Sequence, residues 1–150
     1  MAYAEMRVYT CIMSTDSPCL CSTLRRITRS VTATYDDALK PVDLRITQFS
    51  VLRTLSRLGP VSVTRLALET ALDRSTMGRN LDPLERRGLV RLDVGEADQR
   101  ERIVHLTEAG IAAIEKALPY WREAQSRLSE AMGPSTFTAI ANKLAALQQP

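Results

Sequence analysis

The sequence predicts a mainly helical fold in which a small β-hairpin follows a helix-turn-helix and longer helices lie at both ends. Three observations predict it. Apolar residues recur at intervals of three and four along most of the chain from residue 19 to 147. Two short helical segments, the second spanning about 73–87, are separated by a brief turn. Between 90 and 106 the apolar period changes to alternation, as in strands.

The composition is that of a soluble globular chain and excludes several classes of protein. The chain has 150 residues, of which 45% are hydrophobic and 25% charged, enough for one self-supporting domain. No apolar run reaches the roughly 18 residues of a membrane helix, and no basic leader precedes Glu5. Three cysteines crowd the N-terminal region, whereas a disulfide framework would spread an even number. We expect a cytoplasmic protein with reduced thiols and no membrane contact.

The N-terminal part predicts a tail and two helices. Residues 1–18 show no sustained period, and we expect a loosely ordered tail. From residue 19 to 39 one apolar stripe predicts a helix, which Pro41 ends. Thr47 is the expected N-cap of a second helix, which ends at Gly59-Pro60.

The helix-turn-helix follows directly. Ser62 begins a short helix with Leu66 and Ala67 facing inward, and a turn around Ala71 leads to Asp73 as the next N-cap. The helix from 73 to 87 buries one apolar face and ends at Gly88, which suits a left-handed C-terminal cap. The residues expected on that buried face are Met77, Leu81 and Leu84.

A hairpin and two helices complete the chain. Residues 90–94 and 102–106 alternate in polarity and flank a turn that begins at Gly95. Thr107 can cap a long helix that ends at Gly133-Pro134, and a last helix spans 135–147. The helices at the two ends carry more apolar surface than this compact unit needs, so we expect them to pack on a second copy of the chain.

Four segments in this order resemble the MarR family of bacterial winged helix-turn-helix repressors. They are Leu-Ala at 66–67, Asp-Arg-Ser-Thr at 73–76, Leu-Glu-Arg-Arg-Gly-Leu-Val at 84–90 and Asp-Gln-Arg-Glu-Arg-Ile-Val-His-Leu-Thr at 98–107. The likeness covers roughly residues 20–148. It implies a single domain over 19–150, with a winged DNA-binding lobe at 45–106 and helical dimerisation regions at 19–44 and 107–150. A homodimer would read a pseudo-palindromic operator in double-stranded DNA.

The second helix of the motif supplies the expected reading residues. A helix in the major groove offers the side chains of its N-terminal end to base edges. Arg79 and Asn80 are expected on bases, since arginine pairs with guanine and asparagine with adenine, whereas Ser75 or Thr76 would hold a phosphate. The full set on this helix is Arg74, Ser75, Thr76, Arg79 and Asn80.

Phosphate contacts and the hairpin complete the predicted interface. Ser62 and Thr64 can contact phosphate at the start of the preceding helix. For Ser62, and for Asp73, simple helix capping is an alternative. Asp98 and Arg100 match the family's Asp-x-Arg pattern, in which the arginine enters the minor groove and the aspartate steadies it. An exposed ion pair is the alternative there, and Arg102 either touches phosphate or merely flanks the strand.

The cysteines suggest a signal. Cys19 and Cys21 lie at the head of the first helix, where the helix N-terminus lowers a thiol pKa. Their placement, with Tyr35 fourteen residues after Cys21, resembles the peroxide-sensing branch of the family, although Arg25 stands where a second tyrosine of that branch is expected. Buried packing and Cys-x-Cys metal binding are alternatives. A small anionic aromatic effector, near Tyr35, Phe49 and Trp121, is another option that the family offers.

No catalytic set, metal site or cofactor motif is expected. The sequence has no Gly-rich phosphate loop and no nucleophile with a histidine at motif spacing. His105, the one histidine, has no partner at metal-ligand spacing, and we expect it to be structural. The net charge of +3 is weak evidence for nucleic acid by itself. A helical dimerisation module that binds protein through the winged lobe is therefore the alternative function.

Overall fold

The computed structural model describes residues 19–95 and 99–146 and divides the chain into two units, residues 1–33 and 34–150. The described part of the first unit is the N-terminal portion of helix α2 (Leu20–Leu39), which continues into the second unit. The predicted tail, 1–18, and the predicted wing residue Asp98 lie outside the described residues. The predicted domain boundaries stay a prediction.

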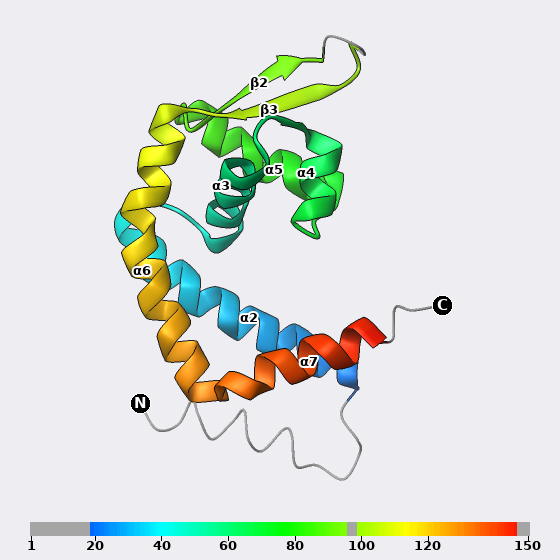
Figure 1. Cartoon of the computed structure of the whole chain (residues 1–150), viewed down its shortest axis with the longest axis vertical. Helices are drawn as coiled ribbons and strands as arrows, with labels where there is room; N and C mark the ends of the chain where they lie inside the picture. The colour runs from blue at the N-terminus through cyan, green and yellow to red at the C-terminus, as the bar shows by residue number, and fades with distance from the viewer. Residues whose placement is uncertain (1–18, 96–98, 147–150) are drawn as a thin grey trace. The chain divides into compact units, whose positions relative to one another are not determined.

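The second unit confirms the mainly helical fold with a small antiparallel sheet (Figure 1). After α2 and the short 3-10 helix η1 (Lys40–Val42) the chain forms α3 (Ile46–Leu58), β1 (Val61–Ser62) and α4 (Val63–Glu69). It continues with α5 (Arg74–Arg86), β2 (Val90–Val94), β3 (Arg102–Leu106), α6 (Glu108–Met132) and α7 (Pro134–Ala146). Helix α6 runs on through Pro119 without interruption.

The sheet has three strands rather than the two of the predicted hairpin. Its order is β1-β3-β2, and both pairings are antiparallel. In the hairpin Leu92 lies opposite Val104, while on the other edge of β3 Val61 pairs with the same residue. Two residues are too few to produce an alternating pattern, which is why β1 gave no signal in the sequence. This short strand ties the segment that enters α4 to the middle of β3.

The core lies where α3, α4 and α5 meet the sheet and the first half of α6. The predicted inward faces of α4 and α5 are confirmed: the side chains of Leu66, Ala67, Met77, Leu81 and Leu84 are all buried. Val90 and Val104 are buried on the strands, whereas Val94 at the far end of β2 is exposed. Burial of this one face fixes the register of the hairpin, because a slip of one residue would turn its apolar side to water.

Helix starts follow the predicted caps with one exception. The side chains of Ser62, Asp73 and Thr107 each accept a hydrogen bond from a backbone N–H in the first turn of α4, α5 and α6. Thr47 as the cap of α3 was wrong. Helix α3 begins at Ile46, whose N–H donates to Asp36 Oδ1 at 2.7 Å, while the Arg45 N–H donates to Gln48 Oε1 at 3.0 Å. A carboxylate ten residues upstream thus supplies the acceptor that we assigned to a local hydroxyl.

Across the part of the chain that the structure describes, no helix has the length and apolarity needed to span a bilayer.

Two glycines give opposite expectations for substitution by alanine. A Cβ on Gly110, in the first turn of α6, would lie 2.2 Å from the Leu89 carbonyl oxygen, so that Gly110→Ala should destabilise the fold by about 1–3 kcal/mol. Gly78, inside α5, has nothing within 4 Å of such a Cβ, so Gly78→Ala should stabilise it by up to about 1 kcal/mol. Urea unfolding at equal protein concentration measures both changes. Equal changes in the free energy of unfolding for the two variants would contradict the close approach of α6 to Leu89.

Candidate nucleic-acid interface

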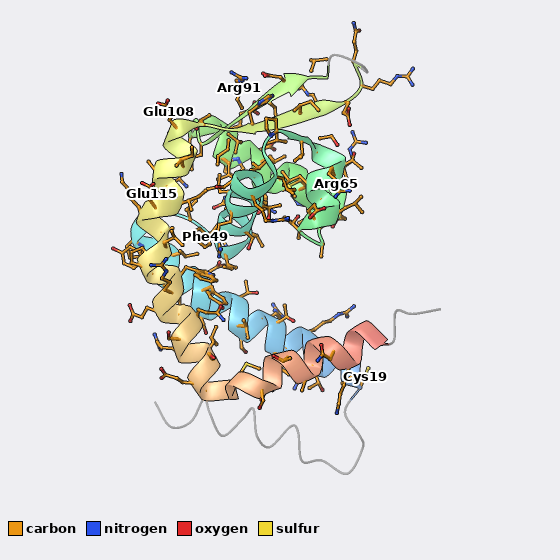
Figure 2. The ribbon with its side chains drawn as sticks, in the orientation of Figure 1. Cys19, Phe49, Arg65, Arg91, Glu108 and Glu115 are labelled. Atoms are coloured by element: carbon orange, nitrogen blue, oxygen red, sulfur yellow. The ribbon has the colours of Figure 1, made fainter. Side chains whose placement is uncertain are left out.

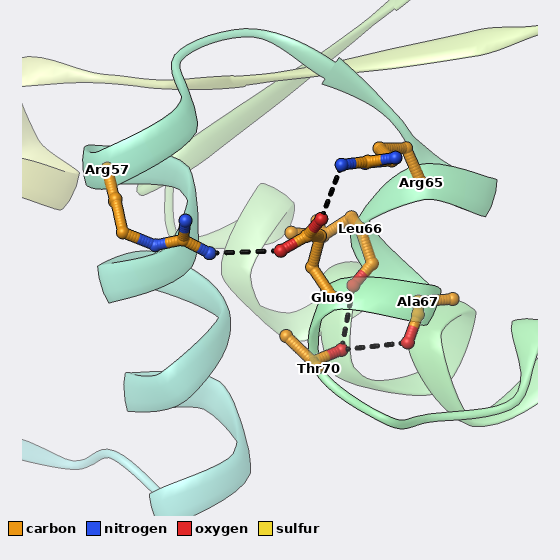
Figure 3. Close-up of polar contacts among 6 residues, drawn as sticks. All are labelled: Arg57, Arg65, Leu66, Ala67, Glu69 and Thr70. Atoms are coloured by element: carbon orange, nitrogen blue, oxygen red, sulfur yellow. Dashed lines mark hydrogen bonds and ion pairs between the residues drawn. The ribbon is translucent and has the colours of Figure 1, made fainter. Parts of the chain in front are cut away.

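The turn between α4 and α5 is held by backbone hydrogen bonds and by one threonine. The Leu72 N–H donates to the Ala67 carbonyl at 2.9 Å, and Ala71 adopts a left-handed conformation with φ of 53°. The Thr70 hydroxyl donates to the Leu66 carbonyl at 2.8 Å and lies 3.3 Å from that of Ala67 (Figure 3). These bonds satisfy the last carbonyls of α4 and direct the chain sharply into α5.

Glu69 connects α4 to α3 through two arginines (Figure 3). Its carboxylate lies 3.0 Å from Arg57 Nη2 on α3 and 2.6 Å from Arg65 Nη2 one turn earlier on α4. The hydrogen bond from Arg57 and the positive charge of Arg65 hold the pKa of the Glu69 carboxyl below its usual range. The carboxylate therefore stays charged and sets the direction of both guanidinium groups.

Helix α5 has one buried face and one polar face. Met77, Leu81 and Leu84 are at most 1% exposed, which fixes the rotation of the helix about its axis. Of the predicted reading residues, Arg74, Ser75 and Arg79 are exposed, and Thr76 and Asn80 are half-buried. Ser75, Thr76 and Arg79 lie on the side of α5 away from the core, and Asn80 lies at the edge of the buried face. Arg74, three residues before Met77, lies on the same stripe as the buried residues and is exposed in the first turn.

Asp73 caps α5 and also accepts hydrogen bonds from two side-chain hydroxyls. Its Oδ1 accepts from the Thr76 N–H at 2.8 Å and from the Ser75 hydroxyl at 2.9 Å, and its Oδ2 accepts from the Thr76 hydroxyl at 2.6 Å. The hydrogen bonds from Thr76, then that from Ser75, hold the pKa of this carboxyl well below its usual range. The capping alternative for Asp73 is confirmed. The hydroxyls of Ser75 and Thr76 donate to Asp73, and the expected phosphate contact of one or the other stays a prediction.

The two residues expected on bases also contact α5 itself. Arg79 Nη2 donates to the Thr76 hydroxyl oxygen at 2.9 Å, and Asn80 Nδ2 donates to the Thr76 carbonyl at 2.8 Å. Arg74, the first residue of α5, is exposed. Base reading by Arg79 and Asn80 stays a prediction, and both side chains are held by contacts within α5.

The phosphate candidates on α4 lie at its start. The Ser62 hydroxyl accepts from the Arg65 N–H at 3.3 Å, so it caps the helix, and Thr64 is exposed in the first turn. Figure 2 shows Arg65 on the same helix. Phosphate contact by Ser62 or Thr64 stays a prediction.

The hairpin carries a charged cluster on one face. Asp93 lies 2.8 Å from Arg91 Nη2 on the same strand and 3.2 Å from His105 Nε2 across the hairpin. His105 thus has a local acidic partner, in line with the structural role expected for it. Arg100 and Arg102 are exposed near the end of the hairpin. Asp98 falls outside the described residues, so its pairing with Arg100 stays a prediction.

The aromatic residues expected near an effector are packed in the second unit. The ring centres of Phe49 and Trp121 lie 6.0 Å apart, and the Arg53 guanidinium carbon is 4.7 Å from the Trp121 ring centre. The Tyr35 hydroxyl donates to Gln125 Oε1, and burial raises the pKa of that hydroxyl. The structure brings Phe49 and Trp121 together and places Tyr35 in a separate hydrogen bond.

The described cysteines, Cys19 and Cys21, are free and exposed in the first unit. Hydrogen bonds from the backbone of Ser22, then of Cys21, lower the pKa of the Cys19 thiol. Neither thiol is buried within one copy of the chain, and burial against a second copy stays an alternative. No group of three or more His, Cys, Asp or Glu side chains within 19–95 and 99–146 could hold a metal ion.

Sequence reasoning missed the Arg57, Arg65 and Glu69 cluster. The spacing of Arg65 and Glu69, four residues apart on a helix, was a local signal for an ion pair. The contact with Arg57 joins two helices and has no such signal. The three contacts of Asp73 with the side chains and backbone of Ser75 and Thr76 were likewise reduced to a single cap.

Comparison with known proteins gives a consistent result. The model of the MarR family matches residues 44–101. The transcriptional regulator MgrA of Staphylococcus aureus is 36% identical over 90 residues, which cover 59% of this chain and 61% of MgrA. The transcriptional repressor NicR of Pseudomonas putida is 33% identical over 100 residues, covering 67% of this chain and 63% of NicR. The matched region thus spans about three fifths of these curated relatives.

Solved structures extend the likeness over most of the chain. The M. tuberculosis regulator MosR in complex with DNA is 37% identical, has a TM-score of 0.75, and covers 87% of this chain and 99% of its own. The similarity therefore includes both the predicted lobe and helices outside it.

The ion pairs of Glu69 generate a prediction about pH. The pKa of the Glu69 carboxyl is lower in the folded protein than in the unfolded chain. The stabilisation from its ion pairs is therefore complete above the ordinary carboxyl pKa and is lost as pH falls through the pKa of the folded protein. Glu69→Gln should therefore lower the free energy of unfolding at neutral pH, and the difference from wild type should shrink below about pH 4. Urea unfolding across pH measures it. Glu85→Gln, at an exposed residue on α5, is the control, and a deficit that persists unchanged at low pH would refute the ion-pair account.

Proposed function

The chain belongs to the MarR family of transcriptional regulators, and from this premise we propose that it binds double-stranded DNA sequence-specifically as a homodimeric repressor. The operator would be pseudo-palindromic, one half-site for each copy. NicR, which is a repressor, supports the sign of regulation. The proposal places the protein in the cytoplasm, where bacterial operators lie.

The observation that carries the proposal is the polar face of α5. Burial of Met77 and Leu81 turns Ser75 and Arg79 to solvent, and Arg74 is exposed in the first turn. Arginine is the residue best suited to pair with guanine edges in the major groove. The DNA complex of MosR, at 37% identity, supports the same partner for this chain.

Exposed apolar side chains on the flanking helices support a second copy as partner. Leu20 and Ile27 are exposed on α2, and Ile111 and Tyr120 are exposed on α6. Covering apolar side chains at these positions with another surface removes them from water, which lowers the free energy. Each helix separately therefore offers apolar surface for dimerisation.

Release from DNA would follow a small ligand or thiol oxidation. The exposed Cys19 thiol, with its lowered pKa, favours attack of a thiolate on a peroxide. An S–O bond forms, the O–O bond breaks, an alcohol or water leaves, and the sulfur is oxidised to a sulfenic acid. The Phe49 and Trp121 rings with Arg53 beside them supply apolar and cationic groups suited to an anionic aromatic effector.

Fluorescence anisotropy tests DNA binding. The wild-type protein should bind a labelled duplex from its own upstream region, with log affinity falling by roughly 0.9 per phosphate contact for each decade of salt. Arg79→Ala should reduce discrimination against altered base pairs by about 1–3 kcal/mol, and Arg100→Ala should weaken binding while the dimer stays intact by sedimentation. Arg122→Ala, which removes an exposed charge from α6, is the matched control.

If the wild-type protein shows no salt-sensitive binding to the duplex, the result contradicts the proposal and favours a winged lobe that binds protein. Unchanged affinity in Arg100→Ala would remove only that residue from the interface.

Peroxide treatment separates the two routes of release. If oxidation releases DNA, mild peroxide should abolish binding by the wild type, a thiol reductant should restore it, and Cys19→Ser should be insensitive. Cys21→Ser is the neighbouring control for a second exposed thiol. Persistent binding after complete oxidation of Cys19, verified by mass spectrometry, would reject the redox route and leave ligand release.

A further inference from the structure

We infer that Asp73 is a positioning residue for DNA reading, which orients the guanidinium of Arg79 through the hydroxyl of Thr76. The inference rests on the proposed DNA binding and assigns a role beyond helix capping to a residue that itself need not touch DNA. It depends on three side chains that follow one another at the start of α5, in the order Asp73, Thr76, Arg79.

The hydrogen bonds run in one direction only. A carboxylate can only accept, so the Thr76 hydroxyl gives its single proton to Asp73 Oδ2, at 2.6 Å. The lone pairs of the same oxygen are then available to accept from Arg79 Nη2, at 2.9 Å. The charge on Asp73 thereby decides which way the hydroxyl points and which side of it Arg79 occupies.

Both oxygens of the Asp73 carboxylate accept hydrogen bonds. Oδ1 caps the helix by accepting from the Thr76 N–H and also accepts from the Ser75 hydroxyl, which leaves Oδ2 for the Thr76 hydroxyl. These bonds keep the pKa of the Asp73 carboxyl well below its usual range, so it remains an acceptor at neutral pH. The relay therefore persists throughout the pH range in which DNA binding would be measured.

Orientation before binding matters for an arginine that reads a base. The guanidinium has five N–H donors, and the bond to Thr76 uses one of them. The others stay available for a guanine edge. Because a flexible side chain must otherwise be ordered when DNA binds, holding it beforehand favours the base that matches its geometry. Loss of the relay should consequently affect discrimination more than general affinity.

Asp73→Asn tests the relay while keeping the cap. Asparagine caps helices about as well as aspartate, so its one oxygen can still accept from the Thr76 N–H. Its amide nitrogen replaces Oδ2 and donates to the Thr76 oxygen, which turns the hydroxyl proton toward Arg79. Asp82→Asn is the matched control, because it removes the same charge from an exposed position on α5. Thr76→Val removes the hydroxyl, and Thr76→Ser retains it.

The measurement is discrimination among duplexes. Wild-type protein selects preferred sequences from a randomised duplex library, and Arg79→Ala identifies the base pair whose identity Arg79 reads. At that base pair Asp73→Asn and Thr76→Val should each lose about fivefold or more in discrimination, the double variant should lose no more, and Thr76→Ser should recover it. Asp82→Asn should keep the wild-type discrimination, and thermal unfolding confirms that each variant is folded.

The outcomes separate the inference from the proposed function. Wild-type discrimination in Asp73→Asn and Thr76→Val, with loss in Arg79→Ala, overturns the relay and leaves DNA binding intact. Loss in Thr76→Val alone overturns the role of Asp73. A uniform loss across all base pairs reduces Asp73 to a structural cap. A wild-type protein with no sequence preference overturns both the inference and sequence-specific binding.

Discussion

Burial of one face of α5 constrains the rest of the lobe. Met77, Leu81 and Leu84 have almost no exposed surface, so the helix cannot rotate without bringing polar groups into the core. Residues on the opposite side, Ser75 and Arg79 among them, are therefore presented at fixed angles. A reading helix needs this fixed rotation more than it needs intrinsic stability, because each base-edge contact depends on direction as well as distance.

Contacts in the segments just before and just after α5 hold both ends of the helix in place. At its start, Asp73 follows a turn whose last α4 carbonyls are satisfied by Thr70, and Glu69 joins α4 to Arg57 on α3. At its end, Arg87 donates to the Asp43 carbonyl and its guanidinium lies 3.5 Å from the Asp43 carboxylate. Exposed ion pairs of this kind contribute little free energy. Their effect is on orientation, since each joins elements that are distant in sequence.

The elements that could be predicted are those whose signal is local. The faces of α3, α4 and α5 follow from apolar spacing, and the caps at Ser62, Asp73 and Thr107 need only a polar side chain before a helix. The errors arise where a distant group intervenes. Asp36 caps α3 from α2, which moved the start away from Thr47, and β1 exists only through its pairing with β3. The candidate interface divides in the same way: its residues were predictable, and their mutual contacts were not.

The acidic residues explain why net charge says little about this surface. Segment 62–106 contains eight basic and eight acidic residues and is formally neutral. In the described part of that segment, Glu69 binds Arg65, Asp93 binds Arg91, and Asp73 acts on Thr76. Each carboxylate lowers the local positive potential that would draw any DNA toward the lobe. Each also restricts a side chain that would otherwise move freely. In the proposed role, such a surface would attract phosphate less strongly but would hold its side chains in a fixed geometry, and contacts to base edges depend on that geometry.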